Sequence, residues 1–401
     1  MPTRIAMVVF SYYPADTRPR REAEALIKEG ISVDMICLRK DFELKKEIVN
    51  NVRVYRLPLK RRRGGKLRYL WEYGCFIMMS FFALSFLFIR EQYKVIHVHN
   101  MPDILVFSSL IPRLYGSKII LDLHDPVPEL FMAKYNIKKE NWFIRILRLQ
   151  EKYSIRFADI VLTPNIAFRN LFVSRGCPKS KIHIVMNSAQ ESIFHKYGTD
   201  INLNFRNNSK FIIIYHGTIT ERNGIKVALE AIALLRDKIP NIVFHVYGEG
   251  DFVNQFRNLV IKLGLENIVY YYGHVSQEKV ALAIQSSHIG LIPNKHSIHW
   301  ELCIPTRIFE YLSLERPVIV PCTKGIKDYF DNESLCFFES GNVESLARAI
   351  FEVYSNPKRV AYILSRGIAA NKKYRWELQR QHLLKLVTRL LGLEARQIKK
   401  V

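Results

Sequence analysis

The chain alternates short apolar runs with longer stretches in which apolar residues recur every three or four positions. Most short runs are continuously apolar, which predicts strands covered on both faces, as in parallel sheets. The longer stretches, such as 224–237, predict helices between the strands and complete an α/β pattern. Strands are expected at 5–10, 33–38, 95–100, 118–124, 159–164, 182–187, 211–217, 242–248, 268–273, 289–294 and 317–322.

The same pattern divides the 401 residues into two series. Residues 196–209 are polar, turn-rich and aperiodic, and we interpret them as a linker. A chain of this length suits two domains of about 200 residues. We therefore expect Rossmann-like domains at 1–195 and 210–373, with a cleft between them, and a final segment at 374–401.

One stretch, 74–89, carries no charge and ends at Arg90. Its 16 residues fall short of the roughly 20 needed to span a bilayer, and it lies between two expected strands. We therefore expect a crossover helix packed on the sheet. The alternatives are a helix with one face in the membrane interface and a transmembrane span.

Composition narrows the classes of function. The six cysteines form no CxxC pair, so neither a disulfide framework nor a zinc site is expected. The first residues lack the apolar run of a secretory signal, and we expect a cytoplasmic protein. A net charge of +23 attracts polyanions such as nucleic acid, anionic lipid or diphosphates. No nucleic-acid-binding signature is present, and both halves are basic, so we expect no nucleic-acid partner.

Open α/β sheets bind ligands at the carboxyl ends of their strands, and polar clusters follow several strands here. After 118–124 come His124, Asp125 and Glu129 in a proline-stiffened loop. An imidazole and two carboxylates at a strand end are candidate catalytic groups. The alternative is an ordinary turn in which Asp125 caps the next helix.

A second cluster begins at Pro305 and Thr306, where the sequence predicts a helix N-terminus whose free N–H groups can bind phosphate. Arg307 could donate two parallel hydrogen bonds to phosphate oxygens. Glu310, about one turn further, could accept from ribose hydroxyls. The alternative is a basic first turn with a solvated glutamate.

A third cluster follows the strand at 211–217. A glycine there, Gly217, lets the backbone approach a ligand closely, and Thr218 follows it. Arg222 precedes the next helix and is placed to contact a diphosphate. Similar turns at the ends of two further strands carry Gly248, His274 and Val275.

The motifs SYYPADTRPRREAEAL, VIHVHNMPD, LDLHDPVPELF, YHGTITERNGI, VYGEGD, YYYGHV and PTRIFEYLSLERPVIV stand in this order along the chain. In this order they resemble the retaining glycosyltransferases of family 4, and the resemblance spans nearly the whole chain. It implies a GT-B fold: two Rossmann-like domains facing each other across a cleft, with the final helix crossing back to the first. The first domain would bind the acceptor and the second the nucleotide-sugar.

The resemblance also implies roles for residues. His124 would contact the transferred sugar, Glu310 would bind the ribose, and Arg222 and Arg307 would neutralise the leaving diphosphate. Gly217 and the residues around His274 would border the nucleotide. The chain has no Asp-x-Asp motif, so no metal is expected. No cofactor is expected either, because the UDP- or GDP-linked sugar is a substrate.

Some positions depart from the family pattern. Thr218 and Asn223 stand where the family usually has arginine and lysine, and Arg307 replaces a lysine. Leu302 stands where a second glutamate is common. These departures keep open a catalytically inactive scaffold partner, beside a sugar-nucleotide epimerase and a non-catalytic basic binding protein.

The expected acceptor is a glycan or a lipid-linked molecule in cell-surface polysaccharide or glycolipid synthesis. A basic cluster precedes an aromatic-rich run at 69–88, which suggests docking on an anionic membrane surface. We expect a peripheral protein on the inner face of the plasma membrane. The basic cluster consists of Lys60, Arg61, Arg62, Arg63, Lys66 and Arg68.

Overall fold

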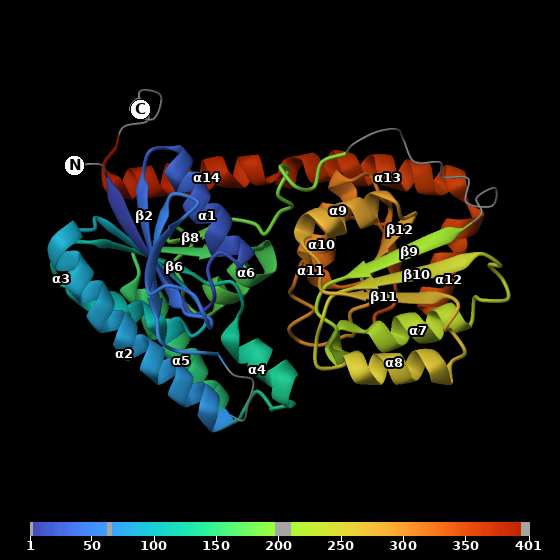
Figure 1. Ribbon diagram of the computed structural model, residues 1–401, viewed down its shortest axis with the longest axis horizontal. Helices are drawn as coiled ribbons and strands as arrows, with labels where there is room; N and C mark the ends of the chain where they lie inside the picture. The colour runs from blue at the N-terminus through green and yellow to red at the C-terminus, as the bar shows by residue number, and fades with distance from the viewer. Residues whose placement is uncertain (1–2, 62–65, 197–209, 394–401) are drawn as a thin grey trace. The chain divides into compact units, whose positions relative to one another are not determined.

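The computed structural model describes residues 3–61, 66–196 and 210–393. The chain forms two compact units, each built around one sheet with helices packed against it (Figure 1). The residues up to Asn187 and those from Gln379 onward form unit 1, and Ser188–Leu378 form unit 2. The expected linker at 196–209 lies outside the described residues except for Lys196.

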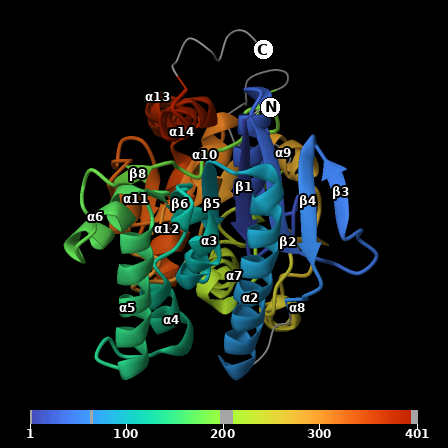
Figure 2. The same cartoon turned by 90° about the vertical axis from the view of Figure 1, so that its left-hand side faces the viewer.

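Unit 1 contains an eight-stranded sheet in the order β3-β4-β2-β1-β5-β6-β7-β8, parallel except for β3 (Figure 2). Its strands are β1 Arg4–Val9, β2 Ser32–Leu38, β3 Lys46–Val49, β4 Val52–Leu57, β5 Val95–His99, β6 Lys118–Asp122, β7 Ile160–Thr163 and β8 Ile182–Ile184. Its helices are α1 Thr17–Lys28, α2 Lys66–Glu91, η1 Asp103–Ser109, α3 Leu110–Leu114, α4 Val127–Tyr135, α5 Trp142–Phe157 and α6 Ile166–Ser174.

All six strands expected in this half are present, and their order explains where a ligand can bind. The chain starts at the centre with β1, builds outward through β2 and β4, and then returns to β5 on the other side of β1. Val8 of β1 lies opposite Ile36 of β2 and Val98 of β5. The loops that follow β1 and β5 therefore diverge and leave a crevice at the carboxyl edge.

The hairpin of β3 and β4 was not expected from the sequence. Its turn residues, Asn50 and Asn51, have φ angles of 52° and 62°, the left-handed conformation that asparagine tolerates in tight hairpin turns. β3 is an edge strand whose residues are partly or fully exposed, so it lacks the apolar run by which the other strands are found.

The uncharged stretch 74–89 lies within α2, the crossover helix between β4 and β5, as expected. Its inner side packs against η1 and the sheet and includes the buried side chains of Phe76, Ser80 and Leu84. By length and composition alone, Leu70–Glu91 would suffice to cross a membrane, with a mean hydropathy of 1.8, but a third of that window is buried inside the protein. The opposite side of α2 carries exposed aromatic and aliphatic residues.

Unit 2 contains a six-stranded sheet in the order β11-β10-β9-β12-β13-β14, with every pairing parallel. Its strands are β9 Phe211–His216, β10 Ile242–Tyr247, β11 Val269–Gly273, β12 Ile289–Leu291, β13 Val318–Pro321 and β14 Cys336–Phe338. Its helices are η3 Glu221–Asn223, α7 Ile225–Ala233, α8 Val253–Lys262, α9 Gln277–Gln285, α10 Thr306–Ser313, α11 Lys324–Lys327, α12 Val343–Ser355, α13 Pro357–Asn371 and η4 Lys372–Tyr374.

The five strands expected in this half are confirmed, and the short β14 is additional. The helix expected at 224–237 is shorter than predicted, because α7 ends at Ala233 and turns continue the chain. Its apolar face still enters the core, where Ala228, Leu229 and Ile232 are fully buried.

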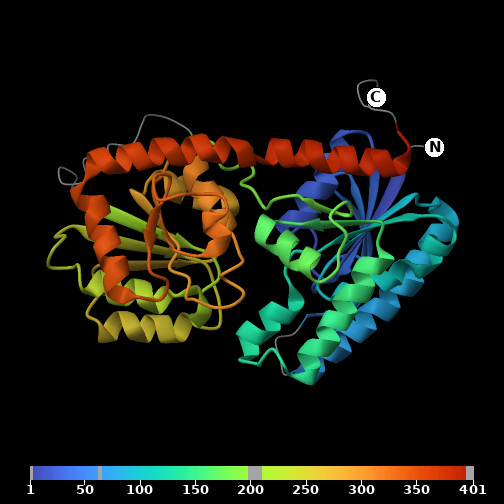
Figure 3. The same ribbon diagram turned by 180° about the vertical axis from the view of Figure 1, so that it is seen from behind.

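The last helix, α14 Trp376–Leu391, returns the chain to unit 1 and is seen along its length in Figure 3. Gln379 Oε1 accepts a hydrogen bond from the backbone N–H of Met186 at 3.0 Å, and Arg380 pairs with Glu29 at 2.7 Å. Leu383 and Val387 are fully buried. The two Rossmann-like sheets and the returning C-terminal helix confirm the predicted fold class.

Candidate functional site

A polar pocket of about 150 Å³ lies at the carboxyl edge of the unit 1 sheet, between β1 and β5. At this point the order in which strands are added to the sheet reverses. Residues after three neighbouring strands line it: Ser11 after β1, Asn100 after β5, and His124 with Asp125 after β6. Arg61 also lines it. The crevice expected from the strand order thus contains two of the predicted catalytic residues.

Two hydrogen bonds with the side chain of Asn100 hold the loop that carries His124. The backbone N–H of His124 donates to Asn100 Oδ1 at 2.8 Å, and Asn100 Nδ2 donates to the carbonyl oxygen of Asp125 at 2.9 Å. The N-cap residue of α4 is Pro126, so the alternative in which Asp125 caps this helix does not apply. His124 is therefore fixed at its backbone while its ring remains partly exposed to the pocket.

The ring of His124 contacts a buried carboxylate. Nε2 of His124 lies 3.3 Å from Oδ2 of Asp122, the last residue of β6, and 3.1 Å from Nδ1 of His99. Asp122 is fully buried, and Arg18 on α1 forms a bidentate pair with it, at 2.8 Å for each oxygen. Arg18 also donates to Asn187 Oδ1 at 2.9 Å.

The charges in this cluster set its protonation. Burial alone would raise the pKa of Asp122, but Arg18 and His124 outweigh it and hold that pKa well below its usual range. Burial likewise opposes a charge on His124, but the Asp122 carboxylate outweighs it and raises the pKa of His124. Burial lowers the pKa of His99, and the neighbouring His97 lowers it further. The arrangement favours a positively charged His124 beside a neutral His99.

Four buried groups behind His124 have the ligand types of a metal site. Atoms of Glu22, His97, His99 and Asp122 lie within 4.8 Å of one another. Arg18, however, already pairs with both oxygens of Asp122 and lies 3.3 Å from Glu22. A cation in their midst would be repelled by the guanidinium, and we interpret the cluster as a charge network that positions His124.

Glu129, a predicted catalytic residue, does not reach the pocket. It is buried on α4, where its carboxylate forms an ion pair with Arg175. Arg175 also contacts Glu151 of α5 at 2.9 Å. These contacts give Glu129 a structural part in joining α4, α5 and the end of α6.

In unit 2, Arg307 lies at the carboxyl edge of the sheet. Its Nη1 donates to the carbonyl oxygen of His216, the last residue of β9, at 2.9 Å. Its Nη2 donates to Asn294 Oδ1 at 3.2 Å, and its guanidinium lies 5.0 Å from the ring centre of Tyr215. Arg307 is thus fixed in place with further N–H groups available for phosphate oxygens.

Glu310 lies one turn along α10 from Arg307 and is largely buried. Its Oε2 is 3.3 Å from Nε2 of His216. Burial, with a smaller contribution from Arg307, lowers the pKa of His216 to about 3, so this imidazole is neutral at physiological pH. The carboxyl group of Glu310 therefore lies beside a neutral imidazole and not beside a cation.

Two glycines bring the backbones after β9 and β10 into direct contact. Gly217 and Gly248 both have φ of +130°. A Cβ on Gly248 would lie 1.9 Å from the carbonyl oxygen of Gly217, and one on Gly217 would lie 3.4 Å from Nη1 of Arg307. The positive φ at both positions and the close backbone contact at Gly248 favour glycine, and the backbone of Gly217 lies beside Arg307.

The remaining predicted donor residues also lie at this edge. Pro305 is the N-cap of α10 and Thr306 its first residue, as expected of a helix N-terminus. Thr218 is exposed in the turn after β9, Arg222 is exposed in η3, and His274 and Val275 follow β11. The carbonyl oxygen of Thr218 accepts from Asn223 Nδ2 at 2.6 Å, so Asn223 braces this turn.

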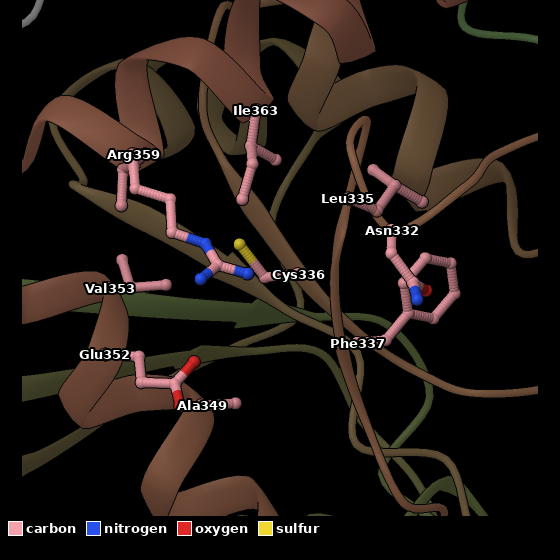
Figure 4. Close-up of a pocket in the computed structure, with 10 residues that line it drawn as sticks. Asn332, Leu335, Cys336, Phe337, Ala349, Glu352, Val353, Arg359 and Ile363 are labelled. Carbon is pink, nitrogen blue, oxygen red and sulfur yellow. The ribbon is translucent and has the colours of Figure 1, made fainter. Parts of the chain in front are cut away.

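Unit 2 also has a pocket of about 220 Å³ between β14, α12 and α13. The side chains of Arg359, Glu352 and Cys336 point into it (Figure 4). None of the predicted donor-binding residues lines this pocket, and we assign it no part in donor binding.

The residues behind His124 were not predicted from the sequence. Arg18 and Glu22 stand in the quoted motif SYYPADTRPRREAEAL, and His97 and His99 stand in VIHVHN. Two histidines two positions apart on a strand point to the same face, which was a usable signal. That they meet Asp122 depends on the pairing of β5 with β6, which a single sequence does not reveal.

Comparisons with known proteins agree with this architecture. The model of the family "Glycosyl transferase 4-like domain" matches residues 15–188, and that of "Glycosyl transferases group 1" matches residues 199–369. Together they account for most of the chain, one in each half.

Two curated relatives share the sequence pattern. An uncharacterized glycosyltransferase of Methanocaldococcus jannaschii is 25% identical over 61% of this chain and 62% of its own. The amylovoran biosynthesis glycosyltransferase AmsK of Erwinia amylovora is 22% identical over 56% of this chain and 54% of its own. The matches thus span less than two thirds of the length of either relative.

Two solved structures share the fold. Sucrose-phosphate synthase from Thermosynechococcus elongatus superposes with a TM-score of 0.77 at 18% identity, over 97% of this chain and 99% of its own. Anabaena HepE in complex with UDP-glucose gives a TM-score of 0.70 at 14% identity, over 96% and 99%. With family models matched in both halves and this fold throughout, the chain belongs to the group 1 glycosyltransferases, the family 4 enzymes of GT-B fold.

Proposed function

We propose that the protein is a retaining glycosyltransferase that moves a sugar from a UDP-linked donor to a glycan or lipid-linked acceptor. The observation that carries this proposal is the placement of Arg307 beside Gly217, whose backbone Gly248 contacts, at the edge where parallel sheets bind ligands. The complex of Anabaena HepE with UDP-glucose supports a UDP-linked donor. AmsK, named for amylovoran biosynthesis, supports an acceptor of the polysaccharide class.

In the proposed reaction, the bond between the sugar C1 and the diphosphate oxygen breaks, and its electron pair leaves with UDP. The acceptor hydroxyl oxygen bonds to C1 on the same face, and its proton passes to the departing diphosphate. The leaving charge is stabilised by Arg307, Arg222 and the N-terminus of α10. The scheme needs no carboxylate nucleophile, and we expect activity to persist in a chelator.

We assign His124 to the transferred sugar. Its Nε2 faces Asp122 and His99, so Nδ1 is the nitrogen that can donate to a sugar hydroxyl. The Asp122 carboxylate favours the protonated ring, which makes that hydrogen bond charge-assisted. Glu310 is assigned to the ribose hydroxyls of the donor, and Glu129 is left out of the chemistry.

We also propose that unit 1 docks on the anionic inner face of the membrane. The exposed side of α2 carries a stripe of large apolar residues, each more than half exposed. The α2 stripe consists of Trp71, Met78, Phe82, Phe86 and Ile89. An exposed apolar stripe on a basic protein is typical of interfacial helices. Of the basic cluster, Arg62 and Arg63 lie outside the described residues.

The test is UDP release from a panel of UDP-sugars, with and without an organic extract of bacterial membranes. We expect release from one UDP-sugar to rise when the extract is added, with the sugar recovered in the lipid or glycan fraction. Conversion of one UDP-sugar to another without the extract would identify an epimerase instead. No turnover of any UDP-sugar under either condition would support an inactive scaffold.

A further inference from the structure

An apolar groove of about 490 Å³ lies in unit 1, beside the polar pocket that contains His124. It is enclosed by α2, η1, α4 and α5; Figure 2 shows α2 and α5 as long helices running in nearly the same direction, and η1 contacts both. Its size falls within the roughly 300–1,000 Å³ of ligand pockets. Three polar residues line it, Asp103, Asn141 and Gln150, and the rest of the lining is apolar or aromatic.

Aromatic side chains form much of the wall. Phe131 of α4 and Phe143 of α5 are in contact, with ring centres 5.7 Å apart, and both pack on a small core that includes Val127 and Leu147. Trp142, at the first turn of α5, lines the groove while more than half of its surface stays exposed. The groove is therefore firmly backed by the core and open to solvent.

The apolar groove and the polar pocket adjoin. Tyr73 of α2 and Met101 after β5 line both. The polar pocket adds His124 and the basic side chain of Arg61, together with two carboxylates, Asp16 and Asp125. A molecule that fills both spaces must therefore have an apolar part and a polar part, and the exposed guanidinium of Arg61 offers a cation to an anionic group.

We propose that this groove holds the hydrocarbon chain of a single-chain, phosphate-linked lipid acceptor, whose phosphate lies near Arg61 and whose sugar-accepting end lies near His124. The proposal rests on the proposed function and specifies its acceptor. The α2 stripe supports a lipid as the occupant, because it places apolar surface on the same helix that walls the groove. A lipid held at the membrane surface could enter the groove between α2 and α5 without leaving an apolar environment.

Gly74 offers a way to block the groove. It lines the groove from α2, and a Cβ built on it meets no atom within 4 Å. Gly74→Phe should therefore be tolerated at its Cβ and place an aromatic ring at the groove, and replacing a mid-helix glycine favours the helix. Leu114→Phe is the matched control: it adds an aromatic ring at an exposed position of α3 that does not line the groove.

The probe is farnesyl phosphate below its critical micelle concentration, titrated calorimetrically into the full chain, with isopentenyl phosphate as the short-chain comparison. We expect farnesyl phosphate to bind at least about 100-fold more tightly, because ten further carbons are buried. Gly74→Phe should weaken farnesyl phosphate at least about tenfold, whereas Leu114→Phe should bind it like the parent protein. The melting temperature of each variant shows whether it is folded.

Equal affinity for the two phosphates, or farnesyl phosphate binding that Gly74→Phe leaves unchanged, would overturn the proposal. It would also be overturned if farnesyl phosphate does not bind, and a change of oligomeric state in Gly74→Phe would then identify the groove as an interface between copies. These results are separable from the proposed function. Turnover of a UDP-sugar without binding of farnesyl phosphate would contradict only the lipid-binding role of the groove. Binding of farnesyl phosphate without turnover of any UDP-sugar would contradict only the proposed transferase activity.

Discussion

Nε2 of His124 lies 3.3 Å from Oδ2 of Asp122, and the Asp122 carboxylate is in turn held by the guanidinium of Arg18. The ring of His124, which faces the pocket, therefore contacts the buried ion pair of Asp122 with Arg18. Removing one partner of such a pair leaves an uncompensated charge and costs about 3–5 kcal/mol. His124 can be changed with less risk to the fold, because its side chain is partly exposed.

The raised pKa of His124 predicts a pH dependence of stability. A histidine whose folded pKa exceeds its unfolded value stabilises the fold below about pH 6.5, and this contribution is lost as pH rises through the folded pKa. The urea midpoint should therefore fall between pH 6 and pH 9, and fall less in His124→Gln. Burial also raises the pKa of Glu22, so this residue contributes its own pH dependence to the stability. The quantity to compare is therefore the difference in urea midpoint between His124→Gln and the parent protein at each pH. An identical fall in both proteins would contradict the ion pair of His124 with Asp122.

Arg307 and Glu310 should support donor binding and leaving-group departure. Arg307→Ala should lower kcat/KM, and Glu310→Ala should weaken UDP-sugar binding, each by about 10- to 150-fold, because a charge-assisted hydrogen bond contributes about 1.5–3 kcal/mol. Arg366→Ala is the control, since this exposed arginine pairs only at the surface, 3.6 Å from Glu333. Parental kinetics in both site variants would show that the donor binds elsewhere.

The contact of Gly248 with Gly217 predicts a position-specific penalty. Gly248→Ala must displace the backbone of the β9 turn, because the new Cβ would lie 1.9 Å from a carbonyl oxygen. Gly341→Ala is a matched comparison, with φ of +81° but no atom within 4 Å of the added Cβ. Backbone strain alone costs about 1–3 kcal/mol, so Gly248→Ala should destabilise unit 2 by more than Gly341→Ala does and should weaken UDP binding. Equal losses of stability, with UDP binding intact, would remove the two-glycine contact from the donor site.

The basic cluster and the α2 stripe should together bind unit 1 to anionic membranes. In co-sedimentation, the protein should pellet with anionic vesicles and not with neutral ones, and salt should release it, because each basic residue near the surface contributes about 1 kcal/mol. Replacing Trp71 and Phe82 by serine should reduce pelleting. Replacing Tyr270 and Leu282 of unit 2, also exposed, should not. Equal recovery in the supernatant with neutral and with anionic vesicles would favour a soluble enzyme with a soluble acceptor.

The strands were predictable because their cores are continuous apolar runs, such as Ile5–Val9, which is fully or almost fully buried. The hairpin of β3 and β4 was missed because an edge strand needs no such run, although the Asn50-Asn51 pair is a turn signal. The family order of the motifs indicated the fold more strongly than any single motif did.

The candidate site was only partly predictable. His124 and Arg307 stand directly after predicted strands or at a predicted helix start, where local sequence is informative. The pairing of Glu129 with Arg175, and of Asp122 with Arg18, joins residues 46 and 104 positions apart. Such contacts depend on how helices pack on the sheet, and local patterns do not contain that information.

The most direct test of the central claim is the stereochemistry of transfer, followed by proton NMR of the product formed from the active UDP-sugar. We predict that the product forms only when acceptor is present and that its anomeric coupling constant shows the same configuration as in the donor. The rate of product formation should drop in Arg307→Ala but not in Arg366→Ala. A product of inverted configuration, or a retained product formed equally fast by Arg307→Ala, would contradict the account.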